Sequence, residues 1–198
     1  MIIGLTGSIA SGKSTVAKML EQYEFPIVDA DLVARVVVEP GKPALQQIKN
    51  KFGEDIVLED GNLNRPKLGN IIFNDPKKRL DLNAIMHPAI RKEMLEQRDK
   101  CLRDGHPVVI MDIPLLFESK LQHFVEKILV VSVTEENQLR RLMERNELSE
   151  ADARARISSQ LPISVKEEGA DAVIYNNESL EETQQQLEAI LRNWKVLK

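Results

Sequence analysis

The segment from Gly7 to Ser14, which reads GSIASGKS, has the residue types and the spacing of a loop that binds the phosphates of a nucleoside triphosphate. Gly7 and Gly12 allow a close approach of the backbone, so successive N–H groups can point at phosphate oxygens. The dipole of a following helix would favour the same negative charge. The alternative is an accidental glycine-rich turn, which is disfavoured because a strand pattern precedes the loop and a helix pattern follows it.

Three side chains after Gly12 would complete such a site. Lys13 can reach the β- and γ-phosphates, the Ser14 hydroxyl can bind Mg²⁺, and the Thr15 hydroxyl can approach the α-phosphate. We therefore expect a nucleoside triphosphate site with Mg²⁺ as the cofactor, and the residues discussed below favour ATP as the phosphoryl donor. The loop residues expected to bind ATP are Gly7, Ala10, Ser11, Gly12, Lys13, Ser14 and Thr15.

Carboxylates follow two of the apolar strand patterns. Asp112 ends the run 108–111, where phosphate-loop enzymes hold a metal-bound water near the loop serine; a helix cap or a strand-end hydrogen bond is the alternative. Asp29 and Asp31 flank the end of an earlier run, at the edge where parallel sheets bind ligands. Asp31 is the better candidate for orienting or deprotonating an acceptor hydroxyl, because it begins the helix beyond the strand, although it can also be an N-cap.

Arg141 and Arg145 are four residues apart, so they share one face of a helix, while Leu142 and its apolar neighbours occupy the other. Arginines closing from a lid would neutralise the charge that phosphoryl transfer spreads over the phosphate oxygens, and we expect Arg141 in that catalytic role. The alternative is a solvated or ion-paired helix surface, which is the preferred interpretation for Arg140 and Arg154.

Two further segments are candidates for the acceptor side. His87 precedes Pro88 in a helical region, and from chemistry alone a structural histidine at a kink is the better interpretation. The apolar residues 115–117 follow Pro114, and they line an acceptor pocket or belong to the core. Glu118 is expected to begin a helix there.

Alternating strand and helix patterns must position these side chains. Five short runs rich in β-branched residues predict parallel strands at residues 2–6, 26–29, 108–111, 128–133 and 172–175. The last helix carries an apolar stripe expected to cover the sheet: Leu180, Leu187, Ile190, Leu191 and Trp194. The fold class is therefore α/β, a P-loop NTPase fold with a five-stranded parallel sheet flanked by helices.

The parts of this single domain follow from the same patterns. Residues 1–40, 106–135 and 168–198 form the core. Residues 41–105 form an inserted helical lobe for the acceptor, with expected breaks at Gly61, Pro66, Pro76 and Pro88. Residues 136–167 form a helical lid, in which helix patterns run from Glu135 to Asn146 and again from a capping sequence at Ser149.

Length and composition argue against several other classes of protein. A length of 198 residues suits one sizeable core with a small appended lobe, and the net charge of -4 provides no general attraction to nucleic acid. Cys101 is the single cysteine, which excludes an intrachain disulfide and favours a reducing compartment. No basic leader precedes the first apolar run and no stretch approaches membrane-spanning length, so we expect a cytoplasmic protein without a membrane partner.

The phosphate loop alone leaves several reactions open. Residues 50–53, NKFG, lack the aspartate of a guanine-binding motif, which disfavours a GTPase. Asp112 is followed by Ile113 rather than by a second carboxylate, which disfavours motor ATPases. A small-molecule kinase fits best.

In combination, these positions resemble the dephospho-CoA kinase family over essentially the whole chain. The resemblance is carried by GLTGSIASGKST at 4–15, VDAD at 28–31, HP at 87–88, DIPLLFE at 112–118 and ADAVIYNN at 170–177. Further matches in and after the lid helices are Gln138, Arg141, Arg145, Arg156, Ile157 and Gln160.

The resemblance implies that ATP phosphorylates the 3′-hydroxyl of the ribose of dephospho-CoA, with Asp31 as the base. It implies that Arg141 and Arg145 close over the phosphates and that Asn176 approaches the adenine of ATP, although Asn176 can also cap the last helix. The residues it places by the acceptor are His87, Leu115, Leu116, Phe117 and Glu118. Another small-metabolite kinase, or a sensor that binds ATP without transferring phosphate, is the alternative.

Overall fold

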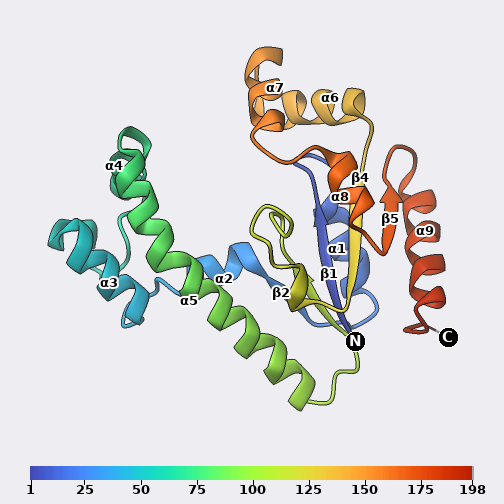
Figure 1. Cartoon of the computed structure of the whole chain (residues 1–198), viewed down its shortest axis with the longest axis horizontal. Coiled ribbons are helices and arrows are strands. Elements are labelled where there is room, and N and C mark those ends of the chain that lie inside the picture. The colour runs from blue at the N-terminus through green and yellow to red at the C-terminus, as the bar shows by residue number, and fades with distance from the viewer. Residues whose placement is uncertain (198) are drawn as a thin grey trace. The chain divides into compact units, whose positions relative to one another are not determined.

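The computed structural model describes residues 1–197, and a five-stranded sheet organises much of it (Figure 1). The strands stand in the order β2-β3-β1-β4-β5, and the pairs β1–β3, β1–β4 and β4–β5 are parallel. Their bounds are β1 Ile2–Gly7, β2 Ile27–Asp29, β3 Val109–Asp112, β4 Lys127–Ser132 and β5 Ala172–Tyr175. The predicted α/β fold with a five-stranded parallel sheet flanked by helices is confirmed.

The register of the central strands determines at which edge of the sheet the functional residues lie. Leu5 of β1 pairs with Asp112 of β3, and Gly7 pairs with Val131 of β4. Because all these strands run the same way, the phosphate loop and the Asp112 carboxylate leave the sheet at the same, carboxyl edge. The fold thus brings two distant sequence segments to one edge.

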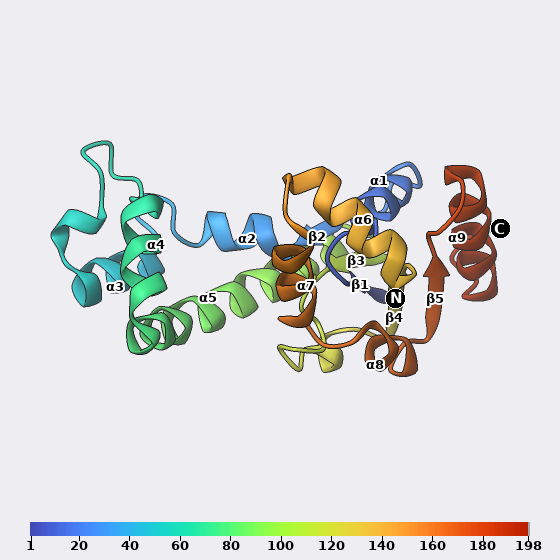
Figure 2. The same ribbon diagram turned by 90° about the horizontal axis from the view of Figure 1, so that it is seen from above.

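Two helices cover one face of the sheet. They are α1 (Lys13–Glu21) and α9 (Leu180–Asn193), and Figure 2 shows α9 beside β5 at the outer edge. Leu187 and Leu191 are buried as the stripe predicted, whereas Leu180 is 60% exposed. The prediction that Leu180 is part of the apolar face covering the sheet is wrong. Leu180 is the first residue of α9 and precedes the part of the helix that packs against the sheet. The buried core between these layers comprises Ile3, Leu5, Val16, Met19, Leu20, Val108, Ile110, Leu129, Val131, Ile174, Leu187 and Leu191.

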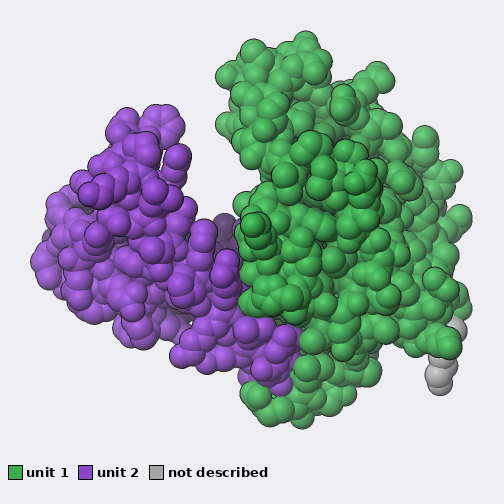
Figure 3. Space-filling model, in the orientation of Figure 1, with its two compact units in different colours: residues 1–28, 101–198 green, residues 29–100 purple. Residues whose placement is uncertain are grey.

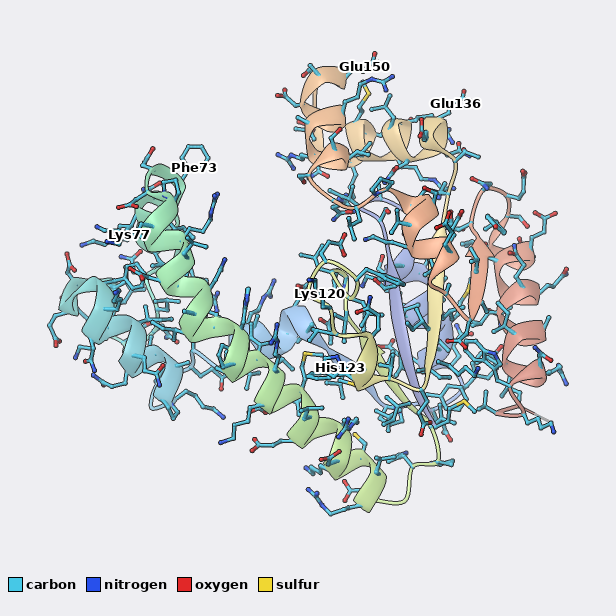
Figure 4. The ribbon with its side chains drawn as sticks, in the orientation of Figure 1. Phe73, Lys77, Lys120, His123, Glu136 and Glu150 are labelled. Atoms are coloured by element: carbon cyan, nitrogen blue, oxygen red, sulfur yellow. The ribbon has the colours of Figure 1, made fainter. Side chains whose placement is uncertain are left out.

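Three short helices lie between β4 and β5. They are α6 (Glu135–Asn146), α7 (Glu150–Ser158) and α8 (Ile163–Glu168). Thr134 and Ser149 are the N-caps of α6 and α7, and each side chain accepts a backbone N–H three residues on, as the sequence around Ser149 predicted. Glu136 in α6 and Glu150 in α7 mark the two helices in Figure 4. The name lid segment is kept below for residues 136–167.

The chain divides into two compact units, coloured separately in Figure 3. Unit 1 comprises Met1–Val28 and Cys101–Lys198 and contains most of the sheet; unit 2 comprises Asp29–Lys100. Unit 2 therefore begins before residue 41 and ends before residue 105, the limits predicted for the helical lobe. No helix within residues 1–197 is long and apolar enough to cross a membrane.

Unit 2 is helical and has a small core of its own. Its elements are α2 (Ala30–Val36), α3 (Pro43–Phe52), the 3₁₀ helix η1 (Glu54–Ile56), α4 (Arg65–Asn74) and α5 (Pro76–Arg103), the last of which continues beyond it. Ile48, Ile56 and Met94 are fully buried in this unit. Phe73 near the end of α4 is 85% exposed, and its ring projects from the helix in Figure 4.

The expected break at Pro88 is wrong, because α5 runs through it without interruption. A proline inside a helix removes the hydrogen bond to the carbonyl four residues earlier. Here Ala84 and Pro88 are both exposed, so water can solvate that carbonyl. The many intact turns on either side then keep the helix continuous.

Candidate active site

The phosphate loop begins at the end of β1 and leads into α1. Gly12 is the N-cap of α1 and has φ +90°, and Ala10 has φ +60°. A Cβ on Gly12 would lie 1.9 Å from Nδ2 of Asn176, so only glycine fits there. A Cβ on Gly7 would lie 2.6 Å from Oγ of Ser11, which excludes a side chain at that position too. A different neighbour therefore excludes a side chain at each of the two glycines of the motif.

Two glutamines from the lid segment hold the middle of the loop. Nε2 of Gln138 donates to the carbonyl of Ile9 at 2.9 Å, and Oε1 of Gln160 accepts the Ile9 N–H at 2.8 Å. Both backbone groups of Ile9 are thus satisfied by side chains far along the sequence. The motif residues gave no indication of this support, and the glutamines appeared only as matches to the family.

Asn176 holds the next part of the loop from the end of β5. Its side chain is buried, its Nδ2 donates to the Ser11 carbonyl at 2.9 Å, and its Oδ1 accepts the hydroxyl of Thr183 at 2.9 Å. Asn177 accepts the N–H of Thr134 at 2.8 Å. Asn176 therefore contacts the expected ATP site through the loop backbone, a contact that its position after a strand did not predict.

Lys13 and Asp112 meet at the carboxyl edge of the sheet. Nζ of Lys13 lies 2.5 Å from Oδ1 of Asp112, and both side chains are largely buried. A charge so little exposed needs a partner, and each supplies one for the other. The predicted phosphate-binding cation and the predicted metal-side carboxylate are thus brought together.

The hydroxyls of the loop differ in their surroundings. Oγ of Ser11 is buried and has no hydrogen-bond partner among residues 1–197. A buried hydroxyl without a partner loses its interactions with water, so this atom fits a site completed by an anionic ligand. Ser14 in the first turn of α1 is exposed, and Thr15 is half-buried.

The arginines of α6 are not equivalent. Arg141 is half-buried, and its guanidinium approaches within 4.0 Å of the position that a Cβ on Gly12 would take. Arg145 is exposed and donates to Oδ1 of Asn146 at 2.9 Å. Arg140 bonds Asn137 on the same helix, and Arg154 pairs with Glu150 on an exposed face of α7. Of these arginines, Arg141 has its guanidinium beside Gly12 at the start of α1.

The segment after β3 is a turn rather than the start of a helix. Its backbone bonds run from Ser119 N to Leu115 O and from Leu121 N to Leu116 O, and the expected helix at Glu118 is absent. Lys120 closes the turn with φ +54°, a left-handed conformation that ends any helical course. The short 3₁₀ helix η2 (Gln122–Phe124), marked by His123 in Figure 4, follows it.

The residues of this turn face different surroundings. Leu115 is 43% exposed, whereas Leu116 is fully buried and Phe117 nearly so. The Phe117 ring packs against Gly169, where a Cβ would lie 2.5 Å from Cε1. Of the three apolar residues predicted beside the acceptor, Leu115 is the one with substantial exposed surface.

Glu118 forms an ion pair that the sequence reasoning missed. Its Oε1 lies 2.8 Å from Nζ of Lys166, a residue with no exposed surface. Nζ of Lys166 also donates to the carbonyl of Gly7 at 3.2 Å. A lysine in a mostly polar helical stretch normally indicates a solvated surface, so no pattern pointed to it.

Unit 2 carries the remaining predicted residues, Asp31 and His87. Asp29, not Asp31, is the N-cap of α2: its Oδ1 accepts the N–H groups of Asp31 and Leu32 at 2.7 and 3.1 Å. The alternative interpretation of Asp31 as the cap is therefore wrong, and its carboxylate is exposed in the first turn. His87 is exposed on α5.

Comparison with known proteins gives a consistent result. A family model described as dephospho-CoA kinase matches residues 1–182. A dephospho-CoA kinase of Bacillus cereus is 51% identical over 100% of this chain and 98% of its own length, and one of Oceanobacillus iheyensis is 54% identical over 99% and 98%. The solved dephospho-CoA kinase from Campylobacter jejuni superposes with a TM-score of 0.76 at 29% identity, covering 98% of this chain and 96% of its own.

The matches extend over both units, and the identities are far above those at which only the fold is shared. The loop, the Lys13–Asp112 pair and the contacts of Asn176 all involve residues of the segments that carry the sequence resemblance. The chain belongs to the dephospho-CoA kinase family.

Proposed function

We propose that this chain transfers the γ-phosphoryl group of ATP to the 3′-hydroxyl of the ribose of dephospho-CoA, giving coenzyme A and ADP. The observation that carries the proposal is the match to dephospho-CoA kinases over the full length of the chain, including the phosphate loop. The acceptor is named by that match, because a phosphate loop alone serves many reactions.

On the donor side, the loop backbone and the N-terminus of α1 bind the phosphates of ATP. Lys13 exchanges its contact with Asp112 for oxygens of the β- and γ-phosphates, and the hydroxyl of Ser11 gains the partner that it lacks. The half-buried position of Arg141 beside the start of α1 supports a role in neutralising charge on the transferring group. Arg145 is proposed as a second, more exposed contact to ATP.

Mg²⁺ fits the donor atoms that the site offers. The Ser14 hydroxyl is exposed at the start of α1, and the Asp112 carboxylate ends β3 at the same edge of the sheet. Magnesium prefers such oxygen ligands together with phosphate oxygens and water. The proposal gives Ser14 a direct contact and Asp112 a contact through water, and the ion would neutralise charge on the phosphates.

On the acceptor side, Asp31 is proposed to orient the 3′-hydroxyl and take its proton as the oxygen attacks the γ-phosphorus and ADP leaves. Asp29 already caps α2, which leaves Asp31 exposed for this role. The other proposed acceptor contacts are the exposed side chains of His87 and Leu115. Leu116 and Phe117 are buried and Glu118 is paired with Lys166, so these three are proposed to support the turn that presents Leu115.

The test is ADP formation by the purified chain with ATP, Mg²⁺ and a panel of acceptors. We expect rapid ADP release with dephospho-CoA and only background release with a nucleoside or a short hydroxy acid. Preference for another acceptor would favour a different small-metabolite kinase. ATP binding without transfer to any acceptor would favour a nucleotide sensor.

A further inference from the structure

Lys166 is the largest fully buried side chain of the described residues, and it is charged. It lies in α8, the last helix of the lid segment before β5. Its Nζ contacts two groups, the carboxylate of Glu118 at 2.8 Å and the backbone carbonyl of Gly7 at 3.2 Å. Burying an ammonium group is unfavourable, so these two contacts must compensate for the lost water.

The two contacts of Lys166 hold together segments whose relative positions matter for the proposed reaction. Gly7 is the residue at which β1 turns into the phosphate loop. Glu118 lies in the turn that follows β3, on the proposed acceptor side. Its Oε1 also accepts the N–H of Leu161, between α7 and α8 of the lid segment. Lys166 of the lid segment is thus linked to both the donor loop and the acceptor-side turn.

Stability alone explains this arrangement poorly. A buried ion pair is often no more stabilising than apolar side chains of the same volume. Here Oε2 of Glu118 is buried without a hydrogen-bond partner in the described part of the chain, which makes the pair less favourable still. A methionine at position 166 would fill the same space without a charge.

Gly7 can be held only through its backbone. Its Cβ position is blocked by Ser11 and by the Val131 carbonyl, so no side chain at residue 7 can anchor the loop. A donor reaching in from another element is the remaining way to fix the Gly7 carbonyl, and the flexible four-carbon stem of lysine suits that task.

We infer that Lys166 is a positioning residue, which fixes the base of the phosphate loop relative to the turn that contains Glu118. This inference rests on the proposed kinase function. Lys166 acts through Gly7 and Glu118 and touches neither substrate. Its effect is on the alignment of donor and acceptor, where a misplacement of about 1 Å can lower the rate about 10²-fold.

Lys166→Met tests the inference. We expect kcat per nucleotide-binding site to fall about 10- to 100-fold while the Kd for ATP changes less than about threefold, because alignment matters most in the transition state. Amide exchange should also quicken in residues 4–12 and 113–121. Assays are run well below the melting temperature of the variant.

Two control variants separate positioning from general destabilisation. Leu191→Ala removes a core side chain of α9 and lowers stability without touching the loop. Lys127→Met removes a more exposed lysine paired with Asp171 at 2.7 Å, at the other end of β4. Both should keep the wild-type kcat. Wild-type kcat in Lys166→Met, or an equal loss in Leu191→Ala, would overturn the inference.

If Lys166→Met does not fold, the double variant Lys166→Met/Glu118→Gln buries no unpaired charge and is compared with Glu118→Gln. A kcat at least about 10-fold below that of Glu118→Gln supports the contact to Gly7, and equal values refute it. Absence of transfer by the wild type would refute the kinase function instead. In that case, the amide-exchange rates of the wild type and Lys166→Met would test the positioning role of Lys166 without a measurement of turnover.

Discussion

The phosphate loop and unit 2 are built in opposite ways. The loop is held from several sides, by Gln138, Gln160 and Asn176, and its lysine is already paired with Asp112. In unit 2, the proposed acceptor residues Asp31 and His87 are exposed side chains on helices. The donor loop is therefore preorganised by contacts within unit 1, whereas the side chains of Asp31 and His87 face solvent.

The largest effect is expected from Lys13→Ala in the preorganised region. Removal of the cation proposed to lie nearest the transferring group should lower kcat at least about 10³-fold. Lys18→Ala, on the exposed side of the same helix, is the matched control and should behave as the wild type. Steady-state kinetics checks both. Activity of Lys13→Ala within about tenfold of the wild type would contradict the loop assignment.

Asp31→Asn tests the exposed acceptor residues of unit 2. We expect kcat to fall about 10²- to 10³-fold with an unchanged Kd for ATP, because only acceptor activation is removed. Asp29→Asn is the control, since asparagine caps a helix as well as aspartate does. Kinetics with calorimetric ATP titration distinguishes the two carboxylates. A larger loss in Asp29→Asn would reverse their proposed roles.

Gly12→Ala tests whether the loop is held as tightly as its contacts indicate. The new Cβ would collide with Asn176, so we expect ATP binding to weaken about 10²-fold, or about 2.7 kcal/mol. Gly105→Ala is a matched control. Its φ is also positive, at +92°, but a Cβ there would meet nothing within 4 Å apart from its chain neighbours. It should lower stability by about 1 kcal/mol and leave ATP affinity unchanged. Equal ATP affinities in the two variants would show that the clash is relieved.

The smallest effect concerns an ion pair of unit 1 that has no part in the proposed reaction. Burial raises the pKa of Asp171, but hydrogen bonds from Lys127 and from the N–H of Ile128 outweigh it and hold the pKa below its ordinary value. The lowered pKa contributes stability above the unfolded pKa of about 3.9, and this is lost as pH falls through the folded pKa. Asp171→Asn should lose about 0.5 kcal/mol at pH 7.

The check is chemical denaturation of the wild type and Asp171→Asn across pH. Their difference in unfolding free energy should shrink as the pH falls below about 4. A difference independent of pH would show that the charge of Asp171 contributes nothing. Turnover at pH 7 should be the same in both proteins, because this pair lies at the amino end of β4.

What the sequence predicted well depends on local patterns. The loop, the strand pattern ending in Asp112 and the capped helix after Ser149 each require only a few neighbouring residues, and the fold places them as expected. The errors at Pro88 and Leu180 also have local causes. An exposed proline was tolerated within a long helix, and the first residue of a helix stayed outside the core.

The supports of the loop were not predictable, because each joins residues more than 100 positions apart. Polar residues such as Gln138 and Lys166 look like solvated surface in a helical pattern. They are buried because Gln138 bonds the phosphate loop and α8 packs against β4. The acceptor was not predictable from physical patterns either. It follows from resemblance, since no spacing within unit 2 specifies a ribose hydroxyl.

Identification of the product tests the central claim most directly. The purified chain is incubated with ATP, Mg²⁺ and dephospho-CoA, and the product is examined by ³¹P NMR and mass spectrometry. The proposal predicts one new phosphate monoester on the ribose 3′-oxygen with equimolar ADP, and none with Lys13→Ala. A phosphate at another position, or ADP formed without a phosphorylated acceptor, would contradict it.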